Sequence, residues 1–314
     1  MKILVTGGSS MVGKHLKKYL PNAIYISSKD CDLKNQASVR ELLFQVRPDK
    51  VIHLAAKVGG ILDNIQDPVG FFEDNILINT NLLRYSYQSR VDHFIGILST
   101  CIYPDKVEEH LYPMNENLLH LGPPTETNFA YGYAKRCLAV QIDAYNKQYQ
   151  TKYNYIIPCN LYSEHDHFEG NKAHFLSSLI NKIYLAKRNN HKNIQLMGSG
   201  TPLRQFMYAG DLAKIIRYML NNNISESFCV APDNHNHTID YMARTILDIL
   251  GKSKMKIEYD SSKPDGQYRK DVSNELMKKF IPSFEFSTFQ KTIPRIYNNN
   301  AIESFTQMAK DTNS

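Results

Sequence analysis

Residues 2–16 read Lys2-Ile3-Leu4-Val5-Thr6-Gly7-Gly8-Ser9-Ser10-Met11-Val12-Gly13-Lys14-His15-Leu16. A short apolar run, a turn of small residues and an amphipathic segment predict a strand, a tight turn and a helix. Glycines let the backbone approach a pyrophosphate, which the free amides and the dipole of a helix N-terminus stabilise. The middle glycine of this Gly-x-x-Gly-x-x-Gly spacing is replaced by Ser10, which is small enough to fit and to bond a phosphate. We predict a dinucleotide-binding turn formed by Gly7, Gly8, Ser9, Ser10, Met11, Val12 and Gly13; the alternative is an ordinary turn at a strand end.

The chain after this turn alternates short β-rich runs with helical stretches. Buried parallel strands are expected at residues 23–27, 51–54, 94–99 and 153–158, and helices at 36–46, 68–88 and 129–148. We therefore predict an α/β fold, a Rossmann-like doubly wound parallel sheet with a smaller C-terminal substrate lobe.

The end of the second predicted strand bears on cofactor choice. It reads Ile26-Ser27-Ser28-Lys29 and lacks the acid at the strand tip that would bind a ribose 2′-hydroxyl. A hydroxyl from Ser28 and an ammonium from Lys29 suit a 2′-phosphate, which predicts NADP(H) rather than NAD. Asp30 follows directly, and Lys29 as a solvated turn residue is the alternative.

The composition and the pattern of expected elements change after Asn160. A polar, His-rich loop is followed by a helix at about 173–188 and later by a Lys-rich stretch at 261–271, while residues 210–220 and 228–231 return to the sheet. We predict an NADP-binding Rossmann domain over residues 1–164, with a return at about 205–235, and a substrate-binding lobe over 165–204 and 236–314.

Composition bounds the class of protein. The chain has 314 residues, 42% of them hydrophobic and 22% charged, which is enough for a substantial core. No apolar run approaches the roughly 20 residues of a membrane-spanning helix, and the N-terminal run is a strand rather than an export signal. The net charge of +6 forms no basic stripe interleaved with aromatics. We expect a cytoplasmic protein that binds anionic small molecules and neither nucleic acid nor membrane.

Metal binding and disulfides are not expected either. The cysteines are odd in number and show no metal-ligand spacing, so reduced thiols are predicted at Cys31, Cys101, Cys137, Cys159 and Cys229.

Tyr131 and Lys135 lie four residues apart in Asn128-Phe129-Ala130-Tyr131-Gly132-Tyr133-Ala134-Lys135 and would share one helix face. A phenol with the usual pKa of about 10 exchanges protons poorly near neutrality. A neighbouring ammonium favours the phenolate, so we expect Lys135 to lower the pKa of Tyr131. The spacing alone is also typical of ordinary surface pairs.

Ser99 and Cys101, in Leu98-Ser99-Thr100-Cys101-Ile102-Tyr103-Pro104, follow the fourth predicted strand. Ligands of open α/β sheets lie beyond the carboxyl ends of the strands, where Tyr131 is also expected. Taken with the dinucleotide turn and Asn-x-x-Tyr-x-x-x-Lys, this order resembles the extended short-chain dehydrogenase/reductase superfamily. In that resemblance Ser99 bonds the substrate oxygen beside Tyr131.

Further segments make the resemblance closer. The chain is similar to the GDP-L-fucose synthase family in Val51-Ile52-His53-Leu54-Ala55-Ala56-Lys57-Val58-Gly59-Gly60-Ile61, Ser99-Thr100-Cys101-Ile102-Tyr103-Pro104, Pro158-Cys159-Asn160-Leu161-Tyr162, Gly198-Ser199-Gly200-Thr201-Pro202-Leu203-Arg204-Gln205-Phe206 and Lys263-Pro264-Asp265-Gly266. The similarity covers about residues 1–275.

That resemblance implies a reaction. Enzymes of the family epimerise GDP-4-keto-6-deoxymannose at C3 and C5 and reduce the C4 ketone with NADPH. Protons next to a ketone are acidic, and inversion needs a base on one face and an acid on the other. By resemblance Cys101 is the base and His174 the acid, while Tyr131 protonates the C4 oxygen, Lys135 lowers its pKa and bonds the nicotinamide ribose, and Ser99 polarises the carbonyl.

The same resemblance implies binding residues and an assembly. Beside the dinucleotide turn and the 2′-phosphate pair, the cofactor would contact Leu54, Ala55, Ala56, Leu98, Tyr131, Lys135, Pro158, Asn160, Leu161 and His174. The GDP-sugar would contact Lys182, Met197, Arg204, Lys256 and Lys270; isolated basic residues of this kind are otherwise surface charges. A homodimer would pair helices 68–88 and 129–148.

Some positions depart from the family pattern and leave alternatives open. Met197 stands where the family has Trp, Ser163 where glycine is usual, and Asn181-Lys182 where it has two arginines. The alternatives are therefore a C4 reductase, an epimerase/reductase for another nucleotide deoxysugar or heptose, and a non-catalytic NADP-binding regulatory protein.

His165, Asp166 and His167 form a cluster that can suggest a metal. The family has a His-Asp-Asn-Phe-like loop at this place, so we expect a solvated loop.

Overall fold

Six parallel strands form the central sheet of the computed structural model, which describes residues 1–170, 173–233 and 236–299. Their order is β10-β5-β4-β3-β1-β2. The bounds are β1 (Ile3–Thr6), β2 (Ile24–Ile26), β3 (Lys50–His53), β4 (His93–Ile97), β5 (Asn154–Pro158) and β10 (Phe228–Val230). The chain runs from β1 outward to β2, then crosses back to β3, so the direction of winding reverses between β1 and β3. That reversal opens a crevice at their carboxyl ends.

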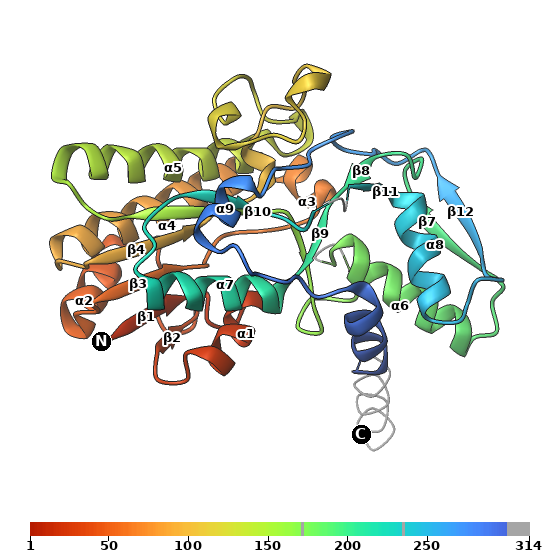
Figure 1. Ribbon diagram of the computed structural model, residues 1–314, viewed down its shortest axis with the longest axis horizontal. Helices are drawn as coiled ribbons and strands as arrows, with labels where there is room; N and C mark the ends of the chain where they lie inside the picture. Colours follow the sequence, from red (N-terminus) through yellow and green to blue (C-terminus); the bar gives the residue numbers. More distant parts are fainter. Residues whose placement is uncertain (171–172, 234–235, 300–314) are drawn as a thin grey trace.

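Helices cover both faces of the sheet, with α1 against α7 on one side and α2, α4 and α5 together on the other (Figure 1). Their bounds are α1 (Met11–Tyr19), α2 (Gln36–Val46), α4 (Pro68–Gln88), α5 (Phe129–Tyr149) and α7 (Ala209–Asn222), with the short α3 (Ile61–Gln66) preceding α4. The doubly wound fold predicted from the sequence is confirmed, and each predicted strand or helix agrees within two residues at either end.

Close backbone contacts explain two glycines of the first turn. Gly7 has φ +70°, and a Cβ there would lie 2.8 Å from the Ala55 nitrogen. A Cβ on Gly13 would lie 2.6 Å from the Gly7 carbonyl oxygen. Ser10 is the N-cap of α1, and its Oγ accepts a bond from the Gly13 amide at 3.2 Å. Small residues are thus required for α1 to start directly against β1 and β3.

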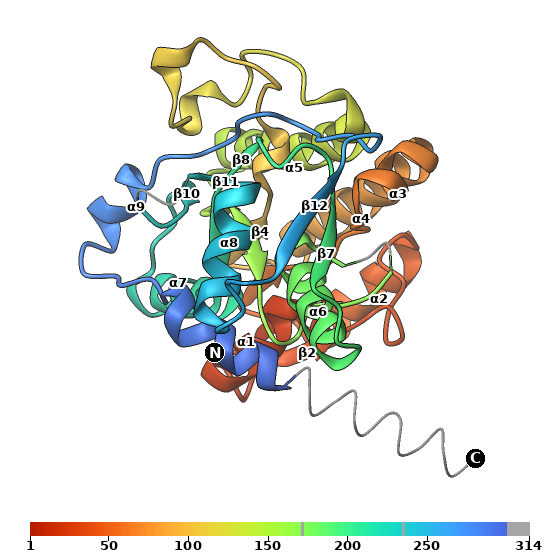
Figure 2. The same ribbon diagram turned by 90° about the vertical axis from the view of Figure 1, so that its right-hand side faces the viewer.

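A second, smaller core lies in the lobe on the right of Figure 1, which faces the viewer in Figure 2. Apolar side chains such as Leu179 and Ile183 from α6 pack there with Met242 and Ile246 from α8. The elements around it are β6 (Asn160–Tyr162), α6 (Phe175–Arg188), β7 (Asn193–Met197), β8 (Leu203–Arg204), β9 (Phe206–Tyr208), β11 (His237–Thr238), α8 (Ile239–Ile249) and β12 (Lys256–Asp260).

The chain passes between the two cores more often than the predicted domain boundaries imply. Residues 236–314 were assigned to the lobe, yet Val272, Met277 and Ile281 join the main core, because α9 (Glu275–Phe280) packs against β10. Residues 171–172, 234–235 and 300–314 lie outside the described residues. We retain the boundaries at about 164, 205 and 235 as a proposal. Among the described helices none is long and apolar enough to cross a membrane.

Candidate active site

A cavity of about 930 Å³ lies where the carboxyl ends of the parallel strands face the lobe. It extends from the first glycine turn to α6 and to β7 and β8 of the lobe. Most of the residues singled out in the sequence line it: Gly7, Ser9, Ser10, Met11, Val12, Ser28, Leu54, Ala55, Ala56, Leu98, Ser99, Cys101, Tyr131, Lys135, Pro158, Asn160, Leu161, His174, Lys182, Met197, Arg204 and Lys270. The size suits a bound organic molecule.

Four predicted binding residues are not on the cavity wall: Gly8, Gly13, Lys29 and Lys256. Gly8 and Gly13 instead allow close packing, since a Cβ on Gly8 would lie 2.7 Å from the Tyr25 Cβ. Lys29 is exposed in the turn after β2. Lys256 is exposed at the start of β12, beside Asn193 of β7. Sequence spacing does not place these two lysines, because the turn after β2 orients Lys29 and the pairing of β12 with β7 orients Lys256.

The segment after β2 brings Lys34, rather than Lys29, to the cavity wall. Asp30 accepts bonds from the Ser27 amide and hydroxyl, both at 2.8 Å, so its carboxylate closes the turn. Ser28 and Lys34 line the cavity. Lys34 lies 3.6 Å from Asp74 of α4, which holds its ammonium near the wall.

Ser99 is the N-cap of a short 3₁₀ turn, Thr100–Ile102, that follows β4, and Cys101 is the middle residue of this turn. The Ser99 Oγ lies 3.4 Å from the Cys101 amide, and the Lys270 ammonium lies 3.6 Å from the Cys101 sulfur. Burial alone would raise the pKa of the Cys101 thiol, but Lys270 and hydrogen bonds from Ser99 and Asn128 bring it below its usual value. This thiol is therefore prepared to act as a base.

Tyr131 and Lys135 share one face of α5, as predicted, but the expected direction of the phenol's pKa shift is wrong. The Lys135 ammonium donates to the Ile97 carbonyl at 2.9 Å. Burial lowers the pKa of Lys135 to about 8. Burial, with a smaller contribution from Cys101, raises the pKa of Tyr131. In this structure the cost of a buried phenolate exceeds any help from the lysine, so the phenol stays protonated.

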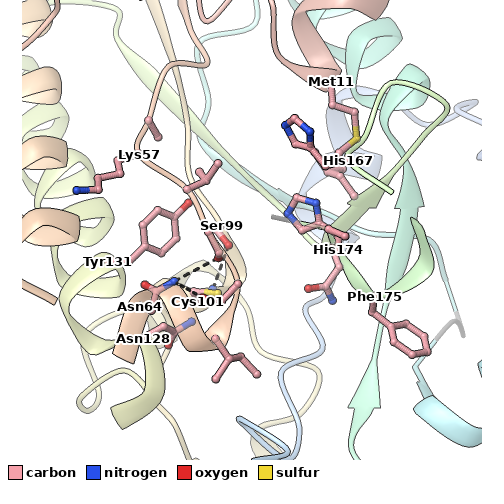
Figure 3. A pocket seen from close by; sticks show the side chains of 18 of the residues that line it. Met11, Lys57, Asn64, Ser99, Cys101, Asn128, Tyr131, His167, His174 and Phe175 are labelled. Atoms are coloured by element: carbon pink, nitrogen blue, oxygen red, sulfur yellow. Dashed lines mark hydrogen bonds between the residues drawn. The ribbon is translucent and has the colours of Figure 1, made fainter. Parts of the chain in front are cut away.

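His174 faces these residues from the opposite wall (Figure 3), at the N-cap of α6. Its Nδ1 lies 2.9 Å from one Asp166 carboxylate oxygen and 3.1 Å from the other. The Asp166 bond, against an opposing effect of burial, raises the pKa of His174. The imidazole is thus held in one orientation and favoured as the cation.

The loop that carries Asp166 is not the solvated loop expected from the sequence. The Asp166 side chain is only 2% exposed and also accepts from the Ser177 hydroxyl. Glu164 is buried nearby, with 8% of its side chain exposed. The carboxylates draw the loop inward because α6 and β9 offer them hydrogen-bond donors.

Basic side chains line the far end of the cavity. Burial lowers the pKa of Arg204 to about 10, against the effects of Cys101 and Asp265. The Arg204 guanidinium also donates to the carbonyl oxygens of Leu203 and Asp265. The Lys182 ammonium donates to the Gln195 carbonyl at 2.7 Å. Lys182 of α6, Arg204 of β8 and Lys270, which follows β12, thus line one cavity and would attract an anion there.

Sequence reasoning missed several residues that the structure brings to the site. Asn128 belongs to the quoted helix motif, and that position was the available signal for its contact with Cys101. Asp166 was noted only as part of a loop. Lys34 and Gln267 line the cavity without any local pattern that marks them.

Comparison with known proteins follows this geometry. Residues 3–231 match the model of the family described as NAD dependent epimerase/dehydratase. GDP-L-fucose synthase from Dictyostelium discoideum is 40% identical over 300 residues, 93% of this chain and 92% of that protein. GDP-L-colitose synthase from Yersinia pseudotuberculosis is 34% identical over 291 residues, 89% and 92% of the two chains.

A solved structure agrees over nearly the whole length. The GDP-L-fucose synthetase from Naegleria fowleri bound to NADP superposes with a TM-score of 0.85 at 33% identity, covering 97% of this chain and 95% of that one.

Proposed function

The chain belongs to the NAD dependent epimerase/dehydratase family, and we propose that it converts GDP-4-keto-6-deoxymannose into GDP-L-fucose by NADPH-dependent epimerisation at C3 and C5 and reduction at C4. The observation that carries the proposal is one cavity with a thiol of lowered pKa on one wall and an imidazole of raised pKa on the other, lined also by the Tyr131 and Lys135 pair of α5. The relatives' names support the nucleotide sugar.

The residues present fit NADP(H). The close approach at Gly7 leaves backbone, not side chain, facing the crevice, and the α1 N-terminus offers free amides for a pyrophosphate. Ser28 and Lys34 suit a 2′-phosphate. When bound, NADPH supplies the hydride that reduces the C4 ketone.

Cys101 and His174 account for epimerisation. The thiolate takes the proton from C3 or C5, and the electron pair moves onto the C4 oxygen as an enolate. Imidazolium at His174 returns a proton to the same carbon from the opposite face, which inverts the centre. Lys270 stabilises the thiolate, and Asp166 holds the imidazolium.

Tyr131 supplies the proton that the C4 oxygen takes up when the ketone is reduced. A phenol with a raised pKa remains protonated and gives its proton to the C4 oxygen as charge develops there. Ser99 bonds the same oxygen, and Lys135, whose ammonium donates to the Ile97 carbonyl, bonds the nicotinamide ribose. Lys182, Arg204 and Lys270 meet the phosphates or the sugar.

The direct test is incubation with GDP-4-keto-6-deoxymannose and NADPH, followed by NMR of the product. GDP-L-fucose is expected. Consumption of NADPH without inversion at C3 and C5 would instead identify a C4 reductase, and tight NADPH binding without turnover of any 4-keto nucleotide sugar would identify a regulatory protein.

A second candidate is the same chemistry on another GDP-deoxysugar. Met197 on the sugar side of the cavity favours it, as does the 34% identity to a GDP-L-colitose synthase. Competition between 4-keto sugars in a single reaction separates the two, because the preferred substrate is consumed first.

Cofactor preference depends on the lysine that lines the cavity. We expect NADPH to be preferred over NADH, and Lys34→Glu to narrow the preference by roughly tenfold, or about 1.4 kcal/mol, through repulsion of the 2′-phosphate. Lys29→Glu, with the same charge change outside the cavity, is the matched control. The measurement is kcat/KM for each cofactor; equal use of both by the unaltered enzyme contradicts the assignment.

Proton exchange at C3 and C5 should have a bell-shaped pH dependence. It falls at low pH as the Cys101 thiolate is protonated, and at high pH as the His174 imidazolium loses its proton. Asp166→Asn removes the main cause of the raised pKa of His174, so the limb of the profile that follows His174 should move to lower pH. Deuterium incorporation across pH measures this; a profile in which neither limb moves would exclude His174 as the acid.

A homodimer through α4 and α5 is the assembly we propose. Apolar side chains such as Leu77 on α4 and Val140 and Tyr149 on α5 are exposed. Val140→Lys should give monomers in light scattering, while Tyr241→Lys on α8 should not. We also propose a cytoplasmic location, since the reaction requires Cys101 as a free thiol.

A further inference from the structure

A second cluster of ionisable side chains lies outside the cavity, where α1 meets the segment after β6. His15, Glu164 and His165 each offer one nitrogen or oxygen atom, and these atoms lie within 4.8 Å of one another. The His15 Nε2 is 3.8 Å from a Glu164 carboxylate oxygen. The ring centroids of His15 and His165 are 4.9 Å apart.

His15 is the unusual member of the cluster. Only 3% of its side chain is exposed, and its Nε2 has no hydrogen-bond partner among the described residues. The distance to Glu164 is too long for a hydrogen bond. A buried polar nitrogen left unpaired costs free energy, and such atoms call for an explanation. A cation between the imidazole and the carboxylate would bind both.

The Glu164 carboxylate is held by two neighbours. The Tyr208 hydroxyl donates to its two oxygens at 2.9 and 2.7 Å. The Arg295 guanidinium lies 3.3 Å from Oε1 and also bonds the Tyr208 hydroxyl. The same guanidinium also lies 3.5 Å from Oε2, so a metal ion would have to replace this long contact at one of the roughly four lone-pair sites of the carboxylate. Carboxylates that bind metals usually accept such bonds, and Arg295 is half-exposed, which screens its repulsion of a cation.

We propose that His15, Glu164 and His165 bind a divalent transition-metal ion of the Zn²⁺ class. Two imidazoles and one carboxylate are a frequent zinc donor set, whereas Ca²⁺ and Mg²⁺ prefer oxygen ligands. Bonds of about 2.1 Å place tetrahedral ligand atoms about 3.4 Å apart, so the three side chains need to close in by side-chain rotation. The sequence had predicted no metal site, because His15 is 149 positions from Glu164 and spacing cannot reveal the group.

The site would tie two functional segments together. His15 lies on the helix that begins at the dinucleotide turn, and His165 precedes Asp166, which holds His174. A bound ion would stabilise the folded protein by mass action and fix the loop that carries Asp166.

The test is Zn²⁺ titration of the metal-stripped full chain, by calorimetry and by thermal unfolding. One ion per chain and a raised Tm are expected. His15→Ala and Glu164→Gln should each weaken binding at least tenfold and abolish the rise in Tm. Arg295→Gln removes the competing cation and should strengthen binding. His110→Ala, at an exposed pair with Glu108, is the matched control and should change neither.

Co²⁺ in place of Zn²⁺ reports the ligands directly. Nitrogen and oxygen ligands give no thiolate charge-transfer band, so an intense band would place the ion at a cysteine instead and overturn the proposal. Unchanged Zn²⁺ binding by the His15→Ala variant would also overturn the proposal. If His15→Ala does not fold, as judged by circular dichroism, His165→Ala provides the same comparison at a less buried position.

Discussion

Replacing Cys101 by serine is expected to abolish most exchange of the C3 and C5 protons while the fold and NADPH binding persist. A serine hydroxyl is far less acidic than a thiol, so the base is lost although its position is kept. The expected decrease in solvent deuterium incorporation is at least ~10²-fold, the range for a lost acid or base. Because the residues for reduction remain, product reduced at C4 without inversion should accumulate.

Cys159→Ala is the matched control for this result. Cys159 lines the same cavity, but burial raises the pKa of its thiol, so it should not act as a base. His174→Asn should behave differently again: it still loses the proton to Cys101 but regains it poorly from the opposite face. NMR of the sugar without reduction measures all three variants. Unchanged incorporation in Cys101→Ser would show that this thiol only packs.

Tyr131→Phe is expected to slow hydride transfer by at least ~10²-fold, because no hydroxyl remains to protonate the C4 oxygen. NADPH binding should survive, since the ring and its edge contact with Phe71 are kept. Single-turnover oxidation of NADPH measures the step. The raised pKa of the phenol adds a second expectation: Tyr131 should not cause any loss of rate below pH of about 10.

Tyr133→Phe serves as the control on the same helix. Tyr133 lies two residues away, is 38% exposed, and does not line the cavity. The Tyr133→Phe variant should reduce the C4 ketone at the unaltered rate. Near wild-type oxidation of NADPH by Tyr131→Phe would remove this phenol from the mechanism, whereas loss in both variants would point to damage of α5.

Local patterns in the sequence determined the fold and most of the cavity wall. A strand, a turn of small residues and a helix are specified by neighbouring residues, so Gly7 to Gly13 could be read directly. The same holds for Tyr131 and Lys135, because helical spacing alone puts them on one face. Parallel strands then bring their carboxyl ends to one edge, which is why Ser99 and Cys101 were placed correctly beside them.

Only the tertiary structure decided the electrostatics and the long-range partners. Lys270 reaches Cys101 across 169 positions of sequence, and no local pattern contains that contact. The Asp166 side chain points inward because donors such as the Ser177 hydroxyl of α6 bond its carboxylate. The pKa of Tyr131 moved opposite to expectation, because burial outweighs a charge four residues away and burial is a property of the whole fold. Sequence thus determined which side chains share an element, and packing determined their charge and their partners.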